Sequence, residues 1–106
     1  MLKKLPGRFT LIMAAKRKTN LAKNVSFSRN FGIRIPKHPF TKIIQKSGLP
    51  FVTTSANIHG KPVITQFKGF PANLKKVDYF IDGGKLGGKA STVVDLTKKK
   101  PVVLRK

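Results

Sequence analysis

The sequence contains no cysteine, no tryptophan and no glutamate, and these absences exclude several kinds of chemistry. Without cysteine, disulfides, thiolate nucleophiles and cysteine-based metal sites are impossible. The three acidic residues are Asp78, Asp82 and Asp95, so we expect no pair of catalytic carboxylates. No apolar run approaches the ~20 residues of a membrane span, and the N-terminus lacks the apolar core of a secretory signal. We therefore expect a cytoplasmic protein with no membrane partner.

Positive charge dominates the composition. Lys and Arg number 23 against three acidic residues, which gives a formal net charge of +20, and residues 1–77 contain no carboxylate side chain. Self-repulsion on this scale destabilises a compact domain, and a bound polyanion relieves it. The expected partners are nucleic acid, nucleotide phosphates or an acidic protein, although a bias toward solubility alone also explains lysine enrichment. Because 40% of the residues are hydrophobic, we expect a folded chain.

Short β-branched and aromatic runs, bounded by Gly, Pro, Asn or Lys, predict six strands. One helix is predicted, because Pro39 is typical of a helix start, Phe40, Ile43 and Ile44 share one face, and Gly48 is typical of a helix end. The six strands are expected at residues 9–14, 31–35, 51–54, 79–82, 91–96 and 102–104.

The remaining segments give little helical cover for such a sheet. Part of 65–76 fits a second helix that Gly69 and Pro71 interrupt, and 16–30 reads as a basic loop with a weak helical piece. At 106 residues the chain is one domain or less. Because an α/β sheet needs helices over its apolar faces, we expect a twisted open sheet of mixed direction that forms the later part of a larger α/β domain.

Two motifs predict anion binding, each with a plainer interpretation beside it. Arg34 lies within a predicted strand, on the face opposite Ile33 and Ile35, where its fork either reaches solvent or grips a carboxylate or phosphate. Ser55 and Asn57 follow an apolar run, where they either donate to phosphate oxygens or close a local turn. Neither has a partner base for nucleophilic catalysis.

A glycine-rich segment, 83–91, nearly matches a phosphate-binding loop. Gly83, Gly88 and Lys89 have the spacing, but Ala90 stands where the magnesium-binding hydroxyl belongs, and a predicted strand follows in place of a helix. The segment is therefore either a backbone anion nest or a plain loop. Histidines 38 and 59 are too far apart to predict a metal site or a catalytic base.

In chain order, five blocks resemble the YrdC-like domain of the L-threonylcarbamoyladenylate synthases. No single block is decisive, but their order and spacing across nearly the whole chain make the resemblance strong. The blocks are Pro6-Gly7-x-x-Thr10; Gly32-Ile33-Arg34-Ile35-Pro36-x-His38-Pro39; Thr54-Ser55-Ala56-Asn57 with Gly60-x-Pro62; Val77-Asp78 with Ile81-Asp82-Gly83-Gly84; and Ser91-Thr92-Val93-Val94-Asp95-Leu96 with Leu104-Arg105.

The resemblance implies three substrates, which are ATP, L-threonine and bicarbonate. Mg is expected to accompany the ATP. Threonine carbamate attacks the α-phosphate of ATP, releasing pyrophosphate and forming threonylcarbamoyl-AMP for the modification of adenosine 37 in tRNA. No catalytic side chain and no protein-held metal are implied. Carried over by position, the threonine site comprises Arg34, Thr53 and Ser91, and the ATP site comprises Asn30, Ser55, Asn57, Val63 and Arg105.

The sequence also departs from the family pattern. The N-terminal portion of the family, with its Pro-Thr-Glu-Thr-type and Lys-x-Arg segments, has no match here, and Asn30 stands where the family usually has Ser or Thr. We therefore expect a partial YrdC-like domain over residues 1–106, its C-terminal portion, that works with a separate N-terminal half. The alternative function is a non-catalytic basic module that binds double-stranded RNA or tRNA.

Overall fold

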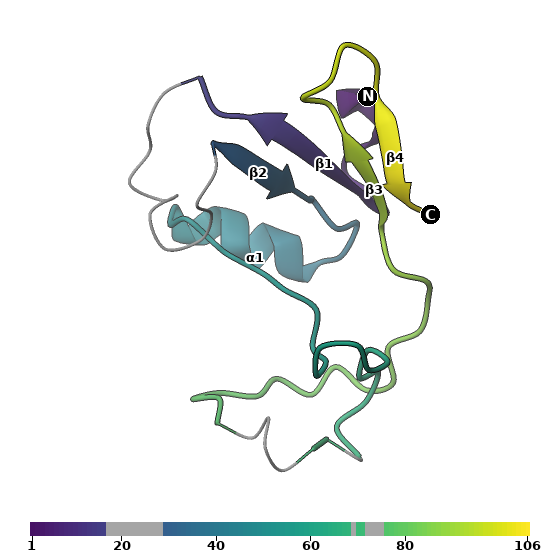
Figure 1. Cartoon of the computed structure of the whole chain (residues 1–106). Helices are drawn as coiled ribbons and strands as arrows, with labels where there is room; N and C mark the ends of the chain where they lie inside the picture. The colour runs from purple at the N-terminus through teal and green to yellow at the C-terminus, as the bar shows by residue number, and fades with distance from the viewer. Residues whose placement is uncertain (17–28, 69, 72–75) are drawn as a thin grey trace. The chain divides into compact units, whose positions relative to one another are not determined.

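The computed structural model describes residues 1–16, 29–68, 70–71 and 76–106. The chain divides into two compact units, one formed by Met1–Phe51 with Ala90–Lys106 and the other by Val52–Lys89. All helices and strands of the described residues belong to the first unit (Figure 1). No helix among these residues has both the length and the apolar character needed to cross a bilayer.

A four-stranded mixed sheet forms the first unit (Figure 1). Its order is β2 (Asn30–Ile33), β1 (Phe9–Ala14), β3 (Thr92–Asp95) and β4 (Val102–Arg105). The central strands β1 and β3 are parallel, whereas β1 pairs with β2 and β3 pairs with β4 in antiparallel fashion. The predicted open sheet of mixed direction is thus confirmed, and its two middle strands come from opposite ends of the chain.

The centre of the sheet carries the core. Leu11 of β1 and Val94 of β3 are paired in the parallel register, and they are the buried hydrophobic residues of the described part, at 0% and 1% exposure. Leu11 also pairs with Ile33 of β2, on its other side. β-branched side chains suit such a surface because they pack well against neighbours on a pleated sheet.

The single predicted helix is confirmed as α1 (Phe40–Ser47). It ends as the sequence indicates, because Gly48 adopts the left-handed conformation with φ of 65° that glycine tolerates at a helix end. His38 Nδ1 accepts a hydrogen bond from the Phe40 N–H at 3.2 Å, so this histidine acts as a turn residue at the helix start. A 3-10 turn, η1 (Leu2–Lys4), precedes β1.

Two of the six predicted strands are wrong. Residues 51–54 and 79–82 are irregular, and Phe51, Val52 and Ile81 are exposed. A β-branched run forms a strand only where another strand pairs with it, and the described ladders join only β1–β4. The proposed second helix within 65–76 falls partly outside the described residues, and its described part is not helical. Most of the predicted loop at 16–30 also lies outside them.

The turn before β1 depends on a glycine. The Gly7 N–H donates to the Ile35 carbonyl at 2.8 Å, which holds this turn against the segment that follows β2. A Cβ atom at Gly7 would lie 2.7 Å from the Lys4 carbonyl oxygen, so any larger residue forces the backbone to move.

We expect Gly7→Ala to lower the free energy of unfolding by about 1–3 kcal/mol, the usual cost of overpacking. Urea denaturation followed by circular dichroism measures it. The control is Gly87→Ala, because a Cβ at Gly87 meets nothing within 4 Å and its φ is not positive. That variant should change stability by less than about 1 kcal/mol. Equal effects of the two substitutions would show that the contact with Lys4 carries no energy.

Candidate anion-binding site at one end of the sheet

Three polar residues, Thr10 of β1, Arg105 of β4 and Ser91 just before β3, form a hydrogen-bonded cluster in the first unit. The hydroxyls of Thr10 and Ser91 lie 2.7 Å apart. The Arg105 guanidinium donates to the Ser91 carbonyl from Nε at 3.2 Å and from Nη2 at 3.1 Å, and Nη2 also lies 3.4 Å from Ser91 Oγ. Ser91 is only 3% exposed, and its hydroxyl and its carbonyl both have hydrogen-bond partners. Two residues with expected ligand contacts, Ser91 and Arg105, are thus brought into direct contact.

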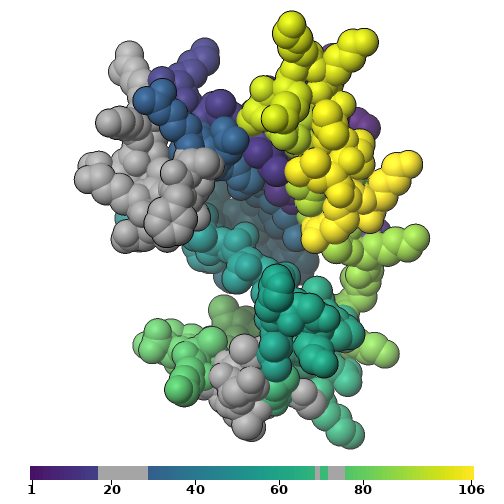
Figure 2. Space-filling view, viewed as in Figure 1, coloured from purple at the N-terminus to yellow at the C-terminus, as the bar shows by residue number. Residues whose placement is uncertain are grey.

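The topology of the sheet explains why these residues meet. Thr10 lies near the start of β1 and Ser91 directly precedes β3, and the two strands are parallel. Arg105 ends β4, which runs antiparallel to β3, so the end of β4 lies beside the start of β3. All three positions therefore belong to the same end of the sheet. Figure 2 shows the β3–β4 region, in yellow-green and yellow, with long side chains projecting from it.

Arg34 lies at the same end. It follows Ile33, the last residue of β2 and the partner of Leu11, and it precedes Ile35, whose carbonyl accepts the Gly7 N–H. The chain here still runs beside the start of β1, although the strand predicted for 31–35 ends at Ile33. Arg34 is exposed, and no described residue is its hydrogen-bond or ion-pair partner. Within the described part of the chain, its guanidinium therefore has unused hydrogen-bond donors.

The electrostatics of this end favour an anion. The Arg105 guanidinium and two hydroxyls are clustered there, and Arg34 follows the edge strand β2 at the same end. The aspartate of this unit, Asp95, is paired with Ile12 and Val102 farther along the strands. The Asp95 carboxylate accepts hydrogen bonds from the Thr97 hydroxyl at 2.6 Å and the Thr97 N–H at 2.8 Å. These bonds lower the pKa of Asp95, with a smaller contribution from Lys98, so its negative charge is committed to the turn after β3.

Asn30 occupies the opposite end of the sheet. It begins β2 and pairs with Ala14, four residues along β1 from Thr10. At about 3.3 Å per residue this separates the two positions by roughly 13 Å. The structure therefore does not place Asn30 in the cluster with Arg105.

The other predicted residues lie in the second unit, where a turn organises them. Ser55 Oγ donates to Asn57 Oδ1 at 2.5 Å, and Asn57 Nδ2 donates to the carbonyls of Ile58 and Lys61 at 3.1 Å each. These bonds agree with the local-turn interpretation of this motif. Thr53 and Val63 flank the turn and are exposed.

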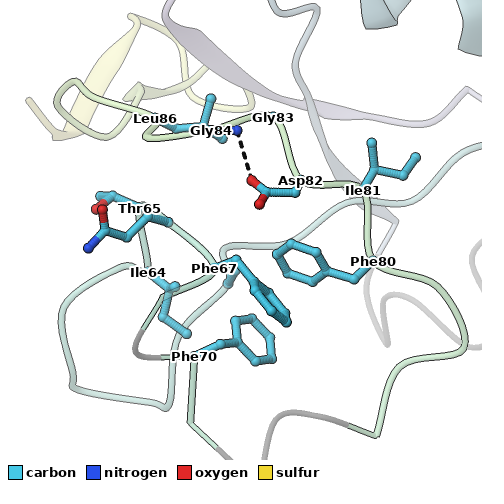
Figure 3. A pocket seen from close by; sticks show the side chains of 12 residues that line it. Ile64, Thr65, Phe67, Phe70, Phe80, Ile81, Asp82, Gly83, Gly84 and Leu86 are labelled. Atoms are coloured by element: carbon cyan, nitrogen blue, oxygen red, sulfur yellow. Dashed lines mark hydrogen bonds between the residues drawn. The ribbon is translucent and has the colours of Figure 1, made fainter.

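A small pocket also lies in the second unit, beside the glycine-rich segment. The rings of Phe67, Phe70 and Phe80 pack together, with the Phe67 and Phe80 centroids 4.5 Å apart (Figure 3). Asp82 closes the turn at its rim by accepting the Gly84 N–H at 2.8 Å. The pocket volume is roughly 130 Å³, below the ~300 Å³ of typical ligand pockets. It resembles a packed aromatic cluster more than a ligand site.

Sequence reasoning missed Thr10 as a site residue. The signal was available, because Thr10 closes the Pro6-Gly7-x-x-Thr10 block, but nothing in the sequence shows that it meets a serine 81 residues away. For metals, the described residues contain no group of three or more His, Asp, Glu or Cys side chains arranged to hold one.

The mixed sheet with one helix defines an α/β protein, and the guanidinium and hydroxyl groups at one end of the sheet are donors of the kind that bind anions. The family model Sua5_yciO_yrdC, described as "Telomere recombination", matches residues 1–106. The chain belongs to this family, as its sequence blocks predicted.

Named relatives include threonylcarbamoyl-AMP synthases. That of Bacillus subtilis is 35% identical over 103 residues, which cover 94% of this chain and 30% of that protein. The putative synthase of Methanocaldococcus jannaschii is 39% identical over 103 residues, covering 95% of this chain and 47% of that protein. The chain thus spans half or less of the length of these relatives.

Solved structures share the fold. The crystal structure of Escherichia coli YciO has a TM-score of 0.81 at 30% identity and covers 98% of this chain and 52% of that one. The crystal structure of Pyrococcus abyssi Sua5 complexed with L-threonine has a TM-score of 0.78 at 34% identity, covering 98% of this chain and 32% of that one. The YrdC-like fold expected from the sequence is therefore confirmed.

Proposed function

We propose that this chain forms part of the substrate site of an L-threonylcarbamoyladenylate synthase. The observation that carries the proposal is the contact of Arg105 with Ser91, with Arg34 following β2 at the same end of the sheet. Homology to threonylcarbamoyl-AMP synthases, and the likeness to a relative crystallised with L-threonine, support it. The cytoplasm and the modification of tRNA are the proposed setting.

In the proposed threonine site, the Arg34 fork binds the carboxylate of L-threonine through two parallel N–H···O bonds. Ser91 uses the hydrogen-bonding capacity that remains on its hydroxyl, and Thr53 completes the contacts. The exposed Arg34 guanidinium and the absence of a described partner for it fit this role.

In the proposed nucleotide site, Arg105 neutralises phosphate charge from the end of β4. Ser55 and Asn57 supply hydroxyl and amide donors, Val63 supplies its backbone, and Asn30 reaches the nucleotide from the far end of β2. For Ser55 and Asn57 this requires the phosphate to replace the turn hydrogen bonds that these side chains make.

The proposed reaction needs no protein nucleophile. The threonine amine and bicarbonate condense to a carbamate with loss of water, and a carbamate oxygen attacks the α-phosphorus of ATP. The bond to the β-phosphate oxygen breaks, and pyrophosphate leaves. Such a transfer depends on orientation and on neutralising charge, which guanidinium groups and hydroxyls supply. Mg²⁺ is proposed to enter bound to the ATP phosphates.

We further propose that residues 1–106 are the C-terminal portion of the ATP- and threonine-binding domain, and that a separate N-terminal half completes it. Titration calorimetry with ATP and L-threonine, together with a pyrophosphate-release assay containing bicarbonate, tests both points. The chain should bind ATP weakly, with tighter binding when threonine is present, and release little pyrophosphate. Binding of neither ligand contradicts the synthase assignment, whereas fast turnover by the chain alone contradicts the need for a second half.

The second candidate function is a non-catalytic module that binds double-stranded RNA or tRNA, and the net charge of +20 favours it. Titrating salt against the affinity for a double-stranded RNA separates the two functions. An RNA-binding module loses affinity steeply, by about 0.7–0.9 in log K for each phosphate contact per unit of log salt. It gains nothing from ATP and threonine together.

A further inference from the structure

We infer that Thr10 is a positioning residue that holds Ser91, the residue through which the proposed threonine contact and the proposed nucleotide contact at Arg105 are joined. The inference rests on the proposed function and goes beyond it, because it joins the two substrate sites through one hydrogen-bonded unit. The connected atoms are Thr10 Oγ1, Ser91 Oγ, the Ser91 carbonyl and the Arg105 guanidinium.

Burial fixes the geometry of this unit. Ser91 is 3% exposed, so no bulk water replaces a partner that its hydroxyl loses. Thr10 belongs to β1 and Ser91 directly precedes β3, and the two strands are hydrogen-bonded to each other, as the Thr92 N–H to Arg8 carbonyl bond at 2.9 Å shows. The β-branched Thr10 side chain has few rotamers, so its hydroxyl is a rigid anchor for the serine.

Hydrogen-bond polarity limits what Ser91 can do. A guanidinium only donates, so Ser91 accepts from Arg105 at its carbonyl and, more weakly, at Oγ. Between Thr10 and Ser91 either hydroxyl can donate. When Thr10 donates to Ser91 Oγ, the Ser91 hydrogen is left to donate to an anion such as a carboxylate. When Ser91 donates, the remaining hydrogen belongs to Thr10. Removing the Thr10 hydroxyl frees Ser91 to turn and removes this arrangement.

The same unit transmits binding between the two sites. When L-threonine accepts a hydrogen bond from the Ser91 hydroxyl, it polarises that hydroxyl, which also contacts Arg105. When a phosphate binds the Arg105 guanidinium, it changes the hydrogen bonds that Arg105 donates to Ser91. Such coupling is reciprocal by linkage, so ATP should raise the affinity for threonine by the same factor as threonine raises that for ATP.

The test compares Thr10→Val, Thr10→Ser and the wild type by titration calorimetry with L-threonine, with and without a non-hydrolysable ATP analogue. Thr10→Val keeps the shape and loses the hydroxyl, so we expect about 2- to 10-fold weaker threonine binding and no mutual enhancement by the analogue. Thr10→Ser keeps the hydroxyl, so it should keep both the wild-type affinity for threonine and the mutual enhancement. The control is Thr41→Val, which removes the hydrogen bond from another threonine hydroxyl of the first compact unit to the Pro36 carbonyl. This variant should leave the coupling between the two ligands unchanged.

A ligand-free measurement separates this inference from the proposed function. The Nε–H resonance of Arg105 in NMR spectra reports its bond to the Ser91 carbonyl, and it should shift or exchange faster in Thr10→Val but not in Thr10→Ser. If the wild type binds neither ligand while this shift occurs, the proposed function fails and the positioning role stands. An unshifted resonance, or mutual enhancement that survives in a folded Thr10→Val protein, overturns the inference.

Discussion

Replacing Leu11 by alanine is expected to lower the free energy of unfolding by about 2–5 kcal/mol, the usual cost of emptying a buried leucine site. Leu11 is 0% exposed and pairs with Val94 on one side and with Ile33 on the other. Small domains are stable by only about 5–15 kcal/mol, so this loss removes much of the total. Urea denaturation measures this loss of stability. If the variant is already unfolded without urea, its circular dichroism spectrum shows the loss directly.

The matched control is Leu104→Ala, which deletes the same atoms from a strand of the same sheet. Leu104 is 57% exposed, so little apolar area returns to water. We expect a loss below about 1 kcal/mol. If the two variants are equally destabilised, the centre of the sheet is not where the stability of this unit resides.

Replacing Arg34 by alanine is expected to weaken L-threonine binding by about 10- to 100-fold. The proposed contact is a charge-assisted, bidentate pair, and hydrogen bonds to charged groups contribute about 1.5–3 kcal/mol. Arg34→Lys keeps the charge and loses the fork, so its affinity should fall between those of the alanine variant and the wild type. Titration calorimetry in the presence of an ATP analogue measures all three.

Two controls show whether the loss is specific. Lys37→Ala removes one positive charge from the same exposed segment and should change threonine affinity less than about twofold. L-threoninamide lacks the carboxylate and should bind the wild type and Arg34→Ala equally weakly. If Lys37→Ala is as damaging as Arg34→Ala, general charge explains the binding, and the carboxylate fork is excluded.

Much of the fold was predictable because the signals were local. The observed bounds of β1 are the predicted ones, and α1 begins after Pro39 and ends before Gly48, as these two residues indicated. The strands expected at 51–54 and 79–82 failed for a non-local reason, since a strand needs a partner and composition does not reveal one. Arg34 likewise lies just past β2 because pairing ends at Ile33, which alternation alone cannot show.

The site was predictable only through the resemblance to a family. The matching blocks predict Arg34, Ser91 and Arg105 as site residues, whereas the residues alone favour a solvated role for Arg34 and are uninformative for Arg105. What brings Ser91 to Arg105 is the antiparallel return of β4, and what brings it to Thr10 is the parallel pairing of β1 with β3. These pairings join residues that are distant in the sequence, so the contact of Thr10 with Ser91 is seen only in the folded structure.

The pairing of β1 with β3 also constrains how the protein is made. Residues 9–12 pair with residues 92–95, so the middle of the sheet cannot close until residues 92–95 have left the ribosome, about 80 residues after β1. Until then the apolar strand β1 is not paired with β3. Chains rich in contacts between residues distant in sequence also fold slowly. During translation this segment is the natural client for a chaperone that binds nascent chains.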